Sequence, residues 1–258
     1  MRYSSLSSGS EGNALLVEAG PAGAPVRILV DCGLGLRDVQ ERLAQRRLAP
    51  SDLHLIFVTH EHADHCAGVA KLARACELPV ACTHGTLVAM GAEALAGLTV
   101  LTVSPHRSID FMGLSLEPIP VPHDAREPVA LAVSDQRHRM AVVTDLGSYT
   151  PHLISCLQGL DAIFLEFNHD AQMLEEGSYP PKLKSRVGGP HGHLSNVTAA
   201  ELLGRLLSAR LQHITAAHLS QQNNHPDRVR ASVAGLPLGQ ACFEVASQDH
   251  GMPWVSLA

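Results

Sequence analysis

The loop Thr59-His60-Glu61-His62-Ala63-Asp64-His65 carries four metal-ligand side chains within six residues. It follows the apolar run Leu53–Thr59, which predicts a buried strand, and precedes Ala67–Cys76, which predicts a helix. His60 and His62 are two apart in an extended segment, so they project the same way and can share one ion. Asp64 and His65, at the helix start, would project to the other side and serve a second ion. This donor set suits zinc, and also manganese or iron.

Two other interpretations of the loop are weaker. A histidine-rich solvated loop, or a helix start capped by Asp64, does not account for so many ligand-type residues together. The His-Glu-x-x-His protease motif does not fit, because its second histidine would fall at Asp64.

Short apolar runs alternate with helical patterns along the rest of the chain. Further strands are predicted at Ala14–Glu18, Arg27–Asp31, Pro79–Cys82, Leu98–Val103, Leu114–Val121, Val129–Val133, Met140–Thr144, Ala162–Phe167, His213–Ala217 and Ala241–Ala246. Helices are predicted over residues 36–43, Pro151–Leu160, Asn196–Leu207 and Asp227–Leu236. No linker interrupts this alternation, which predicts a single layered α/β domain over residues 1–258.

Composition sets limits on partners and location. Apolar residues make up 45% of the chain, enough for a substantial core, and the formal net charge of −6 argues against a broad basic surface for duplex nucleic acid. There is neither a signal-peptide pattern nor an apolar stretch of membrane-spanning length, so we expect a cytoplasmic protein without membrane contact. The six cysteines contain no CxxC pair and do not indicate a thiolate metal cluster.

The candidate chemical residues share one placement. Each sits where a predicted strand gives way to a loop: Asp31, His60, His123, Asp145, Glu166 and His218. Ligand sites gather at strand ends in sheets flanked by helices, so this placement predicts one convergent site.

A His-x-His-x-Asp-His loop after an apolar strand, with isolated His and Asp residues downstream, resembles the metallo-β-lactamase fold superfamily. The resemblance implies an αββα four-layer sandwich with the site along one edge. It makes Asp31 a structural aspartate. It implies two metal sites, the first formed by His60, His62, His123 and Asp145, and the second by Asp64, His65, Asp145 and His218.

Two later motifs indicate phosphodiester cleavage. Glu166, in Glu166-Phe167-Asn168-His169-Asp170, and His193, in His193-Leu194-Ser195, follow the order of the tRNase Z-like phosphodiesterases. In that group the glutamate orients the histidine, which assists the leaving group. The alternative for His193 is an ordinary residue at a helix start, beside the cap Ser195. tRNA processing is disfavoured, because the 21 residues between His123 and Asp145 cannot hold a tRNA-gripping arm.

The chain contains an ordered set of motifs that resembles compact bacterial hydrolases of the YycJ/WalJ type. The set includes Ser7-Ser8-Gly9-Ser10-Glu11-Gly12-Asn13 and His218-Leu219-Ser220-Gln221-Gln222-Asn223-Asn224. That resemblance implies a 5′-to-3′ exonuclease acting on DNA, at single strands or ends. Two divalent ions would lower the pKa of a water between them, and Asp64 would position the hydroxide formed. His193, braced by Glu166, would protonate the leaving oxygen.

Three further sequence features each have a functional and a purely structural interpretation. The basic cluster Lys182, Lys184 and Arg186 predicts a loop that either binds backbone phosphates or is simply solvated. His169 either approaches the metal or phosphate or caps the next helix with Asp170. The stretch Ser7–Asn13 either presents N–H groups to a phosphate or, more simply, forms a tight hairpin.

Two other functions compete with the nuclease. A thioesterase or lactonase would use the same metals on a carbonyl carbon, without needing Glu166 and His193. A non-catalytic metal-binding protein would need the ligands but no substrate contacts.

Overall fold

The computed structural model describes residues 1–20 and 23–258 and contains two seven-stranded sheets. The first sheet has the order β14-β1-β2-β3-β4-β5-β6 and the second β13-β12-β11-β10-β9-β8-β7. The strands of the first sheet are β1 Arg2–Ser7, β2 Ala14–Ala19, β3 Val26–Val30, β4 Leu55–Phe57, β5 Val80–Thr83, β6 Val100–Val103 and β14 Val255–Ser256. Those of the second are β7 Ile109–Phe111, β8 Leu114–Pro120, β9 Val129–Ser134, β10 Arg139–Val143, β11 Ala162–Glu166, β12 His213–Ala217 and β13 Cys242–Val245.

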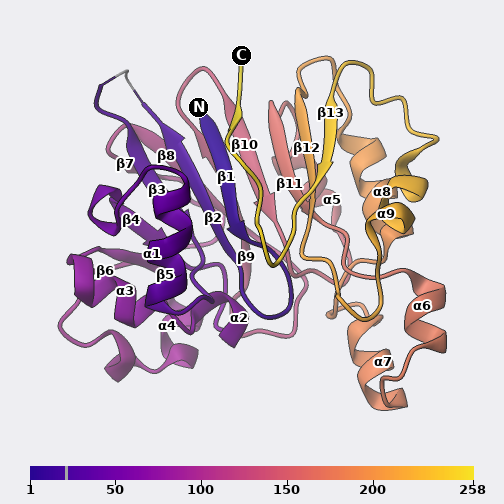
Figure 1. Ribbon diagram of the computed structural model, residues 1–258, viewed down its shortest axis with the longest axis horizontal. Helices are drawn as coiled ribbons and strands as arrows, with labels where there is room; N and C mark the ends of the chain where they lie inside the picture. The colour runs from indigo at the N-terminus through magenta and orange to yellow at the C-terminus, as the bar shows by residue number, and fades with distance from the viewer. Residues whose placement is uncertain (21–22) are drawn as a thin grey trace.

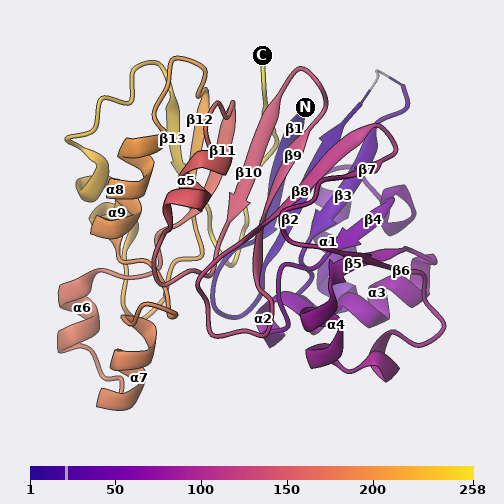
Figure 2. The same ribbon diagram turned by 180° about the vertical axis from the view of Figure 1, so that it is seen from behind.

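Three apolar clusters hold these layers together. One joins the inner faces of the two sheets, with Val17 and Phe57 from the first and Leu131 and Phe164 from the second. The other two lie between each sheet and its own helices. Helices α1 Leu36–Gln45, α3 Val69–Cys76 and α4 His84–Met90 cover the first sheet, and α5 Pro151–Cys156, α8 Asn196–Leu206 and α9 Pro226–Val233 cover the second (Figures 1 and 2). The predicted αββα four-layer sandwich is therefore confirmed.

Most predicted elements are present, with shifted ends. The helix expected over Ala67–Cys76 is present as α3, which starts at Val69 after its N-cap Gly68, and a separate short helix, α2 Ala63–Cys66, precedes it. A Cβ on Gly68 would lie 2.0 Å from the Leu34 carbonyl oxygen, so only glycine permits this close packing against the loop after β3. The strand expected over Leu53–Thr59 is shorter, because the chain leaves the sheet after Phe57.

Several elements were not predicted. They are strands β1, β7 and β14, helices α4, α6 Ala171–Glu176 and α7 Pro181–Val187, and the 3-10 turns η1 Pro50–Asp52 and η2 Ala92–Leu95. The hairpin interpretation of Ser7–Asn13 is correct, since this segment joins the antiparallel pair β1 and β2. Within the described residues, no helix is long and apolar enough to cross a bilayer.

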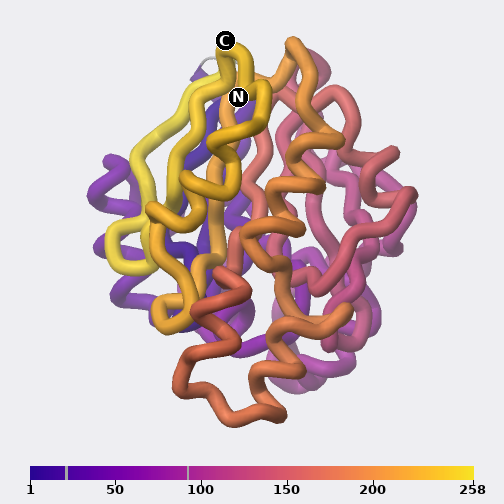
Figure 3. Tube along the Cα trace, turned by 90° about the vertical axis from the view of Figure 1, so that its right-hand side faces the viewer, coloured from indigo at the N-terminus to yellow at the C-terminus, as the bar shows by residue number. Residues whose placement is uncertain are grey.

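The parallel strands set the position of the site. Strands β10, β11 and β12 run parallel in continuous register, and β3 runs parallel to β4, so their carboxyl ends reach the same end of the sandwich. Helix α2 lies at that end, and α6 and α7 extend beyond the sheets there, as the orange-red segment at the bottom of Figure 3 shows. Both chain ends lie at the opposite end of the sandwich (Figure 1).

Candidate metal centre

The first group of ligand side chains contains His60, His62 and His123, whose ring nitrogens lie within 4.8 Å of one another. His62 Nδ1 is 3.2 Å from His123 Nε2. His123 Nδ1 donates to the Gly192 carbonyl oxygen at 2.9 Å, which leaves Nε2 with a free lone pair. His60 Nε2 is buried and has no hydrogen-bond partner among the residues that the structure describes. An uncompensated buried nitrogen of this kind is what a metal ligand needs.

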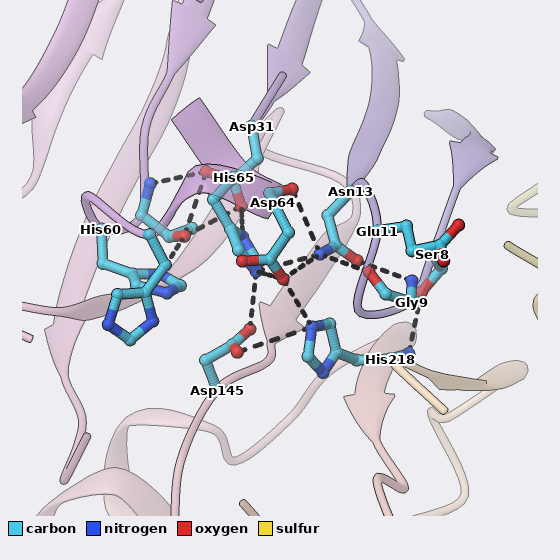
Figure 4. Close-up of polar contacts among 12 residues, drawn as sticks. Ser8, Gly9, Glu11, Asn13, Asp31, His60, Asp64, His65, Asp145 and His218 are labelled. Carbon is cyan, nitrogen blue, oxygen red and sulfur yellow. Dashed lines mark hydrogen bonds and ion pairs between the residues drawn. The ribbon is translucent and has the colours of Figure 1, made fainter. Parts of the chain in front are cut away.

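The second group contains Asp64, His65 and His218 (Figure 4). Asp64 Oδ2 lies 3.3 Å from His65 Nε2 and 3.3 Å from His218 Nε2. Asp145 lies between the two groups, with Oδ2 3.1 Å from His65 Nε2 and Oδ1 3.9 Å from His123 Nε2. All seven predicted ligands therefore come together at one end of the sandwich, with a carboxylate between the groups.

Asp31 positions the loop of residues 59–65 through hydrogen bonds to Thr59 and His65. The backbone N–H of Thr59 donates to Asp31 Oδ1 at 2.8 Å, and the Thr59 hydroxyl donates to Oδ2 at 2.8 Å. Asp31 Oδ2 is also 2.8 Å from His65 Nδ1. A proton on Nδ1 leaves His65 Nε2 free to bind a metal, which is the usual arrangement behind a ligating histidine.

The buried carboxylates create a demand for positive charge. Burial alone would lower the pKa of His218, but Asp145, Asp64 and Glu166 raise it to about 10. The same competition between burial and carboxylates raises the pKa of His65 well above its usual value. Divalent cations would supply this charge, so the residues present fit a metal centre in both donor chemistry and electrostatics.

Three residues of the centre adopt the left-handed backbone region. Asp31 (φ 62°), Asp145 (φ 60°) and His218 (φ 54°) each follow directly or closely after a strand. This region is unfavourable for residues with a Cβ, and the sharp turn it produces aims each side chain back across the strand ends.

Glu166 and His193 form a buried pair beside this centre. Glu166 Oε1 is 2.7 Å from His193 Nδ1, while Oε2 accepts backbone N–H groups of Leu146 and Leu194 at 3.2 and 3.0 Å. Burial opposes ionisation of Glu166, but His193 and the hydrogen bonds lower its pKa to about 2. Burial would likewise lower the pKa of His193, and Glu166 raises it above its usual value. The His193 ring stacks on His218 with centroids 5.4 Å apart, so its free Nε2 edge belongs to the same site.

Glu166 and His193 also fall within ligand distance of Asp145 and His218. We assign Glu166 to orienting rather than to metal binding, because both of its oxygens already accept hydrogen bonds from the protein.

Gly147 permits the loop that carries His193 to approach the strand ends. A Cβ at this position would lie 2.4 Å from the Gly189 carbonyl oxygen and 2.4 Å from the Gly192 nitrogen. The close packing of this loop holds the Gly192 carbonyl against His123, and so it places the next residue, His193, at the edge of the centre.

Comparison with known proteins identifies the family. A family model described as the beta-lactamase superfamily domain matches residues 26–214. The chain belongs to the β-lactamase superfamily.

Two relatives within this superfamily match most of the chain. The protein named exodeoxyribonuclease YycJ of Bacillus anthracis is 34% identical over 98% of this chain and 97% of its own length. Exodeoxyribonuclease WalJ of Streptococcus pneumoniae is 33% identical over 86% of this chain and 83% of its own length. The crystal structure of the metallo-β-lactamase fold protein YhfI from Bacillus subtilis has the same fold, with a TM-score of 0.76 at 16% identity over 98% of each chain. These matches confirm the predicted resemblance. They also confirm that the chain is a metal-dependent hydrolase of the β-lactamase superfamily.

The prediction of a loop for Lys182, Lys184 and Arg186 is wrong. These basic residues lie on the helix α7. Pro181 starts the helix with its φ already suited to a first turn. Arg186 Nε donates to Asp124 Oδ2 at 2.6 Å, and Lys184 Nζ donates to the Glu175 carbonyl, so both side chains have protein partners. Lys182 is exposed on the same helix.

His169 does not cap the next helix. That role belongs to Asp170, whose side chain accepts the Met173 N–H at 3.0 Å. The His169 ring is buried, and no group in the described part of the chain hydrogen-bonds to its Nδ1.

Sequence reasoning missed the part played by the N-terminal hairpin. Asn13 Nδ2 lies 3.2 Å from Asp64 Oδ2 and 3.0 Å from His65 Nε2, and the Ser8 hydroxyl accepts the backbone N–H of His218 at 2.8 Å (Figure 4). The Ser/Gly-rich string Ser7–Asn13 was the available signal, but its pattern indicates a turn and not which loop the turn contacts.

Proposed function

We propose that the chain is a dinuclear metal-dependent phosphodiesterase that acts as a 5′-to-3′ exonuclease on DNA. The observation that carries this proposal is the Glu166–His193 pair beside the two ligand groups. Hydrolysis of a thioester would not need this pair, because a thiolate leaves without a proton, whereas a departing sugar oxygen needs one. The names of the YycJ and WalJ relatives support DNA as the polymer.

In this proposal one ion is held by His60, His62 and His123 and a second by Asp64, His65 and His218, with Asp145 contributing to both. Histidine and carboxylate donors fit zinc or manganese, and iron is chemically acceptable. When bound, two such ions supply Lewis acidity at the phosphate and activate water.

The protein residues have separate roles in the reaction. His193 Nδ1–H donates to Glu166 Oε1 at 2.7 Å, which fixes the ring orientation, and in the imidazolium form the opposite nitrogen, Nε2, carries the second proton that is offered to the leaving oxygen. The raised pKa of His193 favours its protonated form near neutral pH. Asp64 lies at the edge of the second group and would accept a hydrogen bond from the attacking water.

The substrate is proposed to be single-stranded DNA or a DNA end. A net charge of −6 requires that strand binding be local, and α7 offers Lys182, Lys184 and Arg186 next to His193. We further propose that residues 1–258 act as one catalytic unit, because a shared apolar cluster joins both sheets, and that the enzyme works in the cytoplasm.

The test is incubation of manganese- or zinc-loaded protein with DNA labelled at either end, with H60A as the metal-site control. Release of labelled mononucleotide from the 5′ end alone is the expected result. H193A should lose about 10²–10⁴-fold in DNA cleavage while it retains any thioester hydrolysis. Equal loss of both activities in a folded, metal-loaded H193A protein would remove the reason for choosing a phosphodiester.

A further inference from the structure

A cavity of about 420 Å³ opens between α6, α7 and the start of α8. Its walls include His169, Leu174, Glu175, Lys184, Gly188 and Ser195. This volume lies in the range of sites for small ligands. None of the residues that we assign to the metal centre lines it, so the cavity is a separate compartment.

The cavity nevertheless adjoins the leaving-group histidine. The backbone N–H of His193 donates to the carbonyl of Val187, the residue before Gly188 in the cavity wall. On the other side, His169 pairs with Ser195 in an isolated β-bridge, and Asn196 donates its N–H to the His169 carbonyl at 2.8 Å. The wall of the cavity is therefore continuous with the backbone that positions His193 and Glu166.

His169 is the buried polar group of this wall. The residue is 4% exposed, and Nδ1 has no hydrogen-bond partner within residues 1–20 and 23–258. Burial lowers the pKa of the ring, so at neutral pH it offers one donor and one acceptor nitrogen. A buried imidazole nitrogen without a partner costs free energy unless a bound molecule satisfies it.

Three other parts of the lining can contact a nucleotide, while Glu175, which adds a carboxylate to the wall, is exposed to solvent. Among residues 1–20 and 23–258, the Lys184 ammonium donates to the Glu175 carbonyl alone, and it retains two N–H groups for a phosphate. Ser195 is the N-cap of the eleven-residue helix α8, whose positive end therefore meets the cavity. Leu174 and Ala171 form an apolar wall for a sugar or base.

We propose that this cavity binds the terminal nucleotide of the DNA strand, with its 5′-phosphate between Lys184 and the start of α8. This inference rests on the proposed exonuclease function. Hydrolysis breaks the bond between phosphorus and the 3′-oxygen of that nucleotide; water supplies hydroxide to phosphorus, and a proton goes to the 3′-oxygen. The fragment that leaves is the terminal 5′-nucleotide, whose 3′-oxygen lies next to His193, so binding of this end nucleotide in the cavity gives 5′-to-3′ polarity.

Binding and cleavage measurements test the two ideas separately. Calorimetry of the metal-loaded full chain with thymidine 5′-monophosphate measures the cavity directly and does not require cleavage. H169A and K184A should each weaken this binding by about tenfold or more, as expected for loss of a hydrogen bond to a charged group. K71A is the matched control, because Lys71 is exposed on α3 at a distance from the cavity, and it should bind as the parent does.

Cleavage of matched oligonucleotides adds a second measurement. The parent should have a lower KM for 5′-phosphorylated than for 5′-hydroxyl DNA, and K184A should reduce that difference. Unchanged nucleotide binding in both variants would overturn the cavity assignment even if DNA cleavage is strong. Variant-sensitive nucleotide binding without any DNA cleavage would support the cavity and refute the exonuclease.

Discussion

Replacing Gly147 with alanine should displace the His193 side chain while its imidazole group stays unchanged. Gly147 does not have a positive φ, so alanine meets no backbone strain there. The new methyl group would lie 2.4 Å from both the Gly189 oxygen and the Gly192 nitrogen. To restore ordinary contact the loop must move by roughly 1 Å, and a displacement of that size at a catalytic group costs on the order of 100-fold in rate.

We therefore expect kcat of G147A to fall about 100-fold, which corresponds to about 2.7 kcal/mol in the activation free energy. Crowding of this kind should also lower the free energy of unfolding by about 1–3 kcal/mol. The assay is steady-state cleavage of end-labelled DNA, with thermal unfolding measured in parallel. G235A is the matched control, since a Cβ on Gly235 meets no atom within 4 Å. A folded G147A protein with kcat within threefold of the parent would refute the argument that this glycine positions His193.

Three further outcomes concern stability. Y3F should lower the free energy of unfolding by about 1–2 kcal/mol with unchanged kcat, because it removes the 2.9 Å hydrogen bond between Tyr3 and Thr215 of the opposite sheet. Denaturant titration measures this loss. Burial would raise the pKa of Glu18, but Arg2 and Arg27 lower it below 4.5, so its carboxylate contributes stability above that pH and loses it as pH falls through the lowered value. E18Q should thus be less stable than the parent at pH 7, by about 1 kcal/mol, and the difference should shrink below pH 4.5; a constant difference would contradict this assignment. Chelation of metal should lower Tm by more than about 3 °C at neutral pH, since the carboxylates of the centre lose their compensating charge, and an unchanged Tm would argue against a structural contribution from the ions.

The convergence of the candidate ligand residues could be predicted because it depends on short-range order and strand direction. The spacing of His60 and His62 sets their common direction within one extended segment. Asp145 and His218 are far apart in sequence, yet the parallel register of β10, β11 and β12 brings them to one edge. A helix–strand alternation predicts parallel strands, and so it also predicts this convergence.

Strand β1 could not be predicted because tertiary packing, and not a local sequence pattern, buries its polar residues. Its sequence Arg-Tyr-Ser-Ser-Leu-Ser shows no apolar alternation, yet Ser4 and Ser5 are fully buried between neighbouring strands. The Ser4 hydroxyl donates to the carbonyl of Met252, more than 200 residues away. A contact of that sequence separation leaves no local pattern.

Helix α7 was missed for a different reason. Its seven residues contain no buried side chain, so no apolar periodicity marks it as a helix. The cavity beside it depends on how α6 and α7 pack beyond the sheets, which the sequence pattern does not specify.

The left-handed backbone of Asp31, Asp145 and His218 has a consequence for efforts to improve this protein. Each such residue with a Cβ costs about 1 kcal/mol or more, and glycine would relieve much of that cost. Libraries selected for folding alone should therefore accumulate glycine at these three positions, and the most robust clones would be inactive. Catalysis and robustness are in direct competition at these strand ends, so an activity screen has to accompany every round of stabilisation.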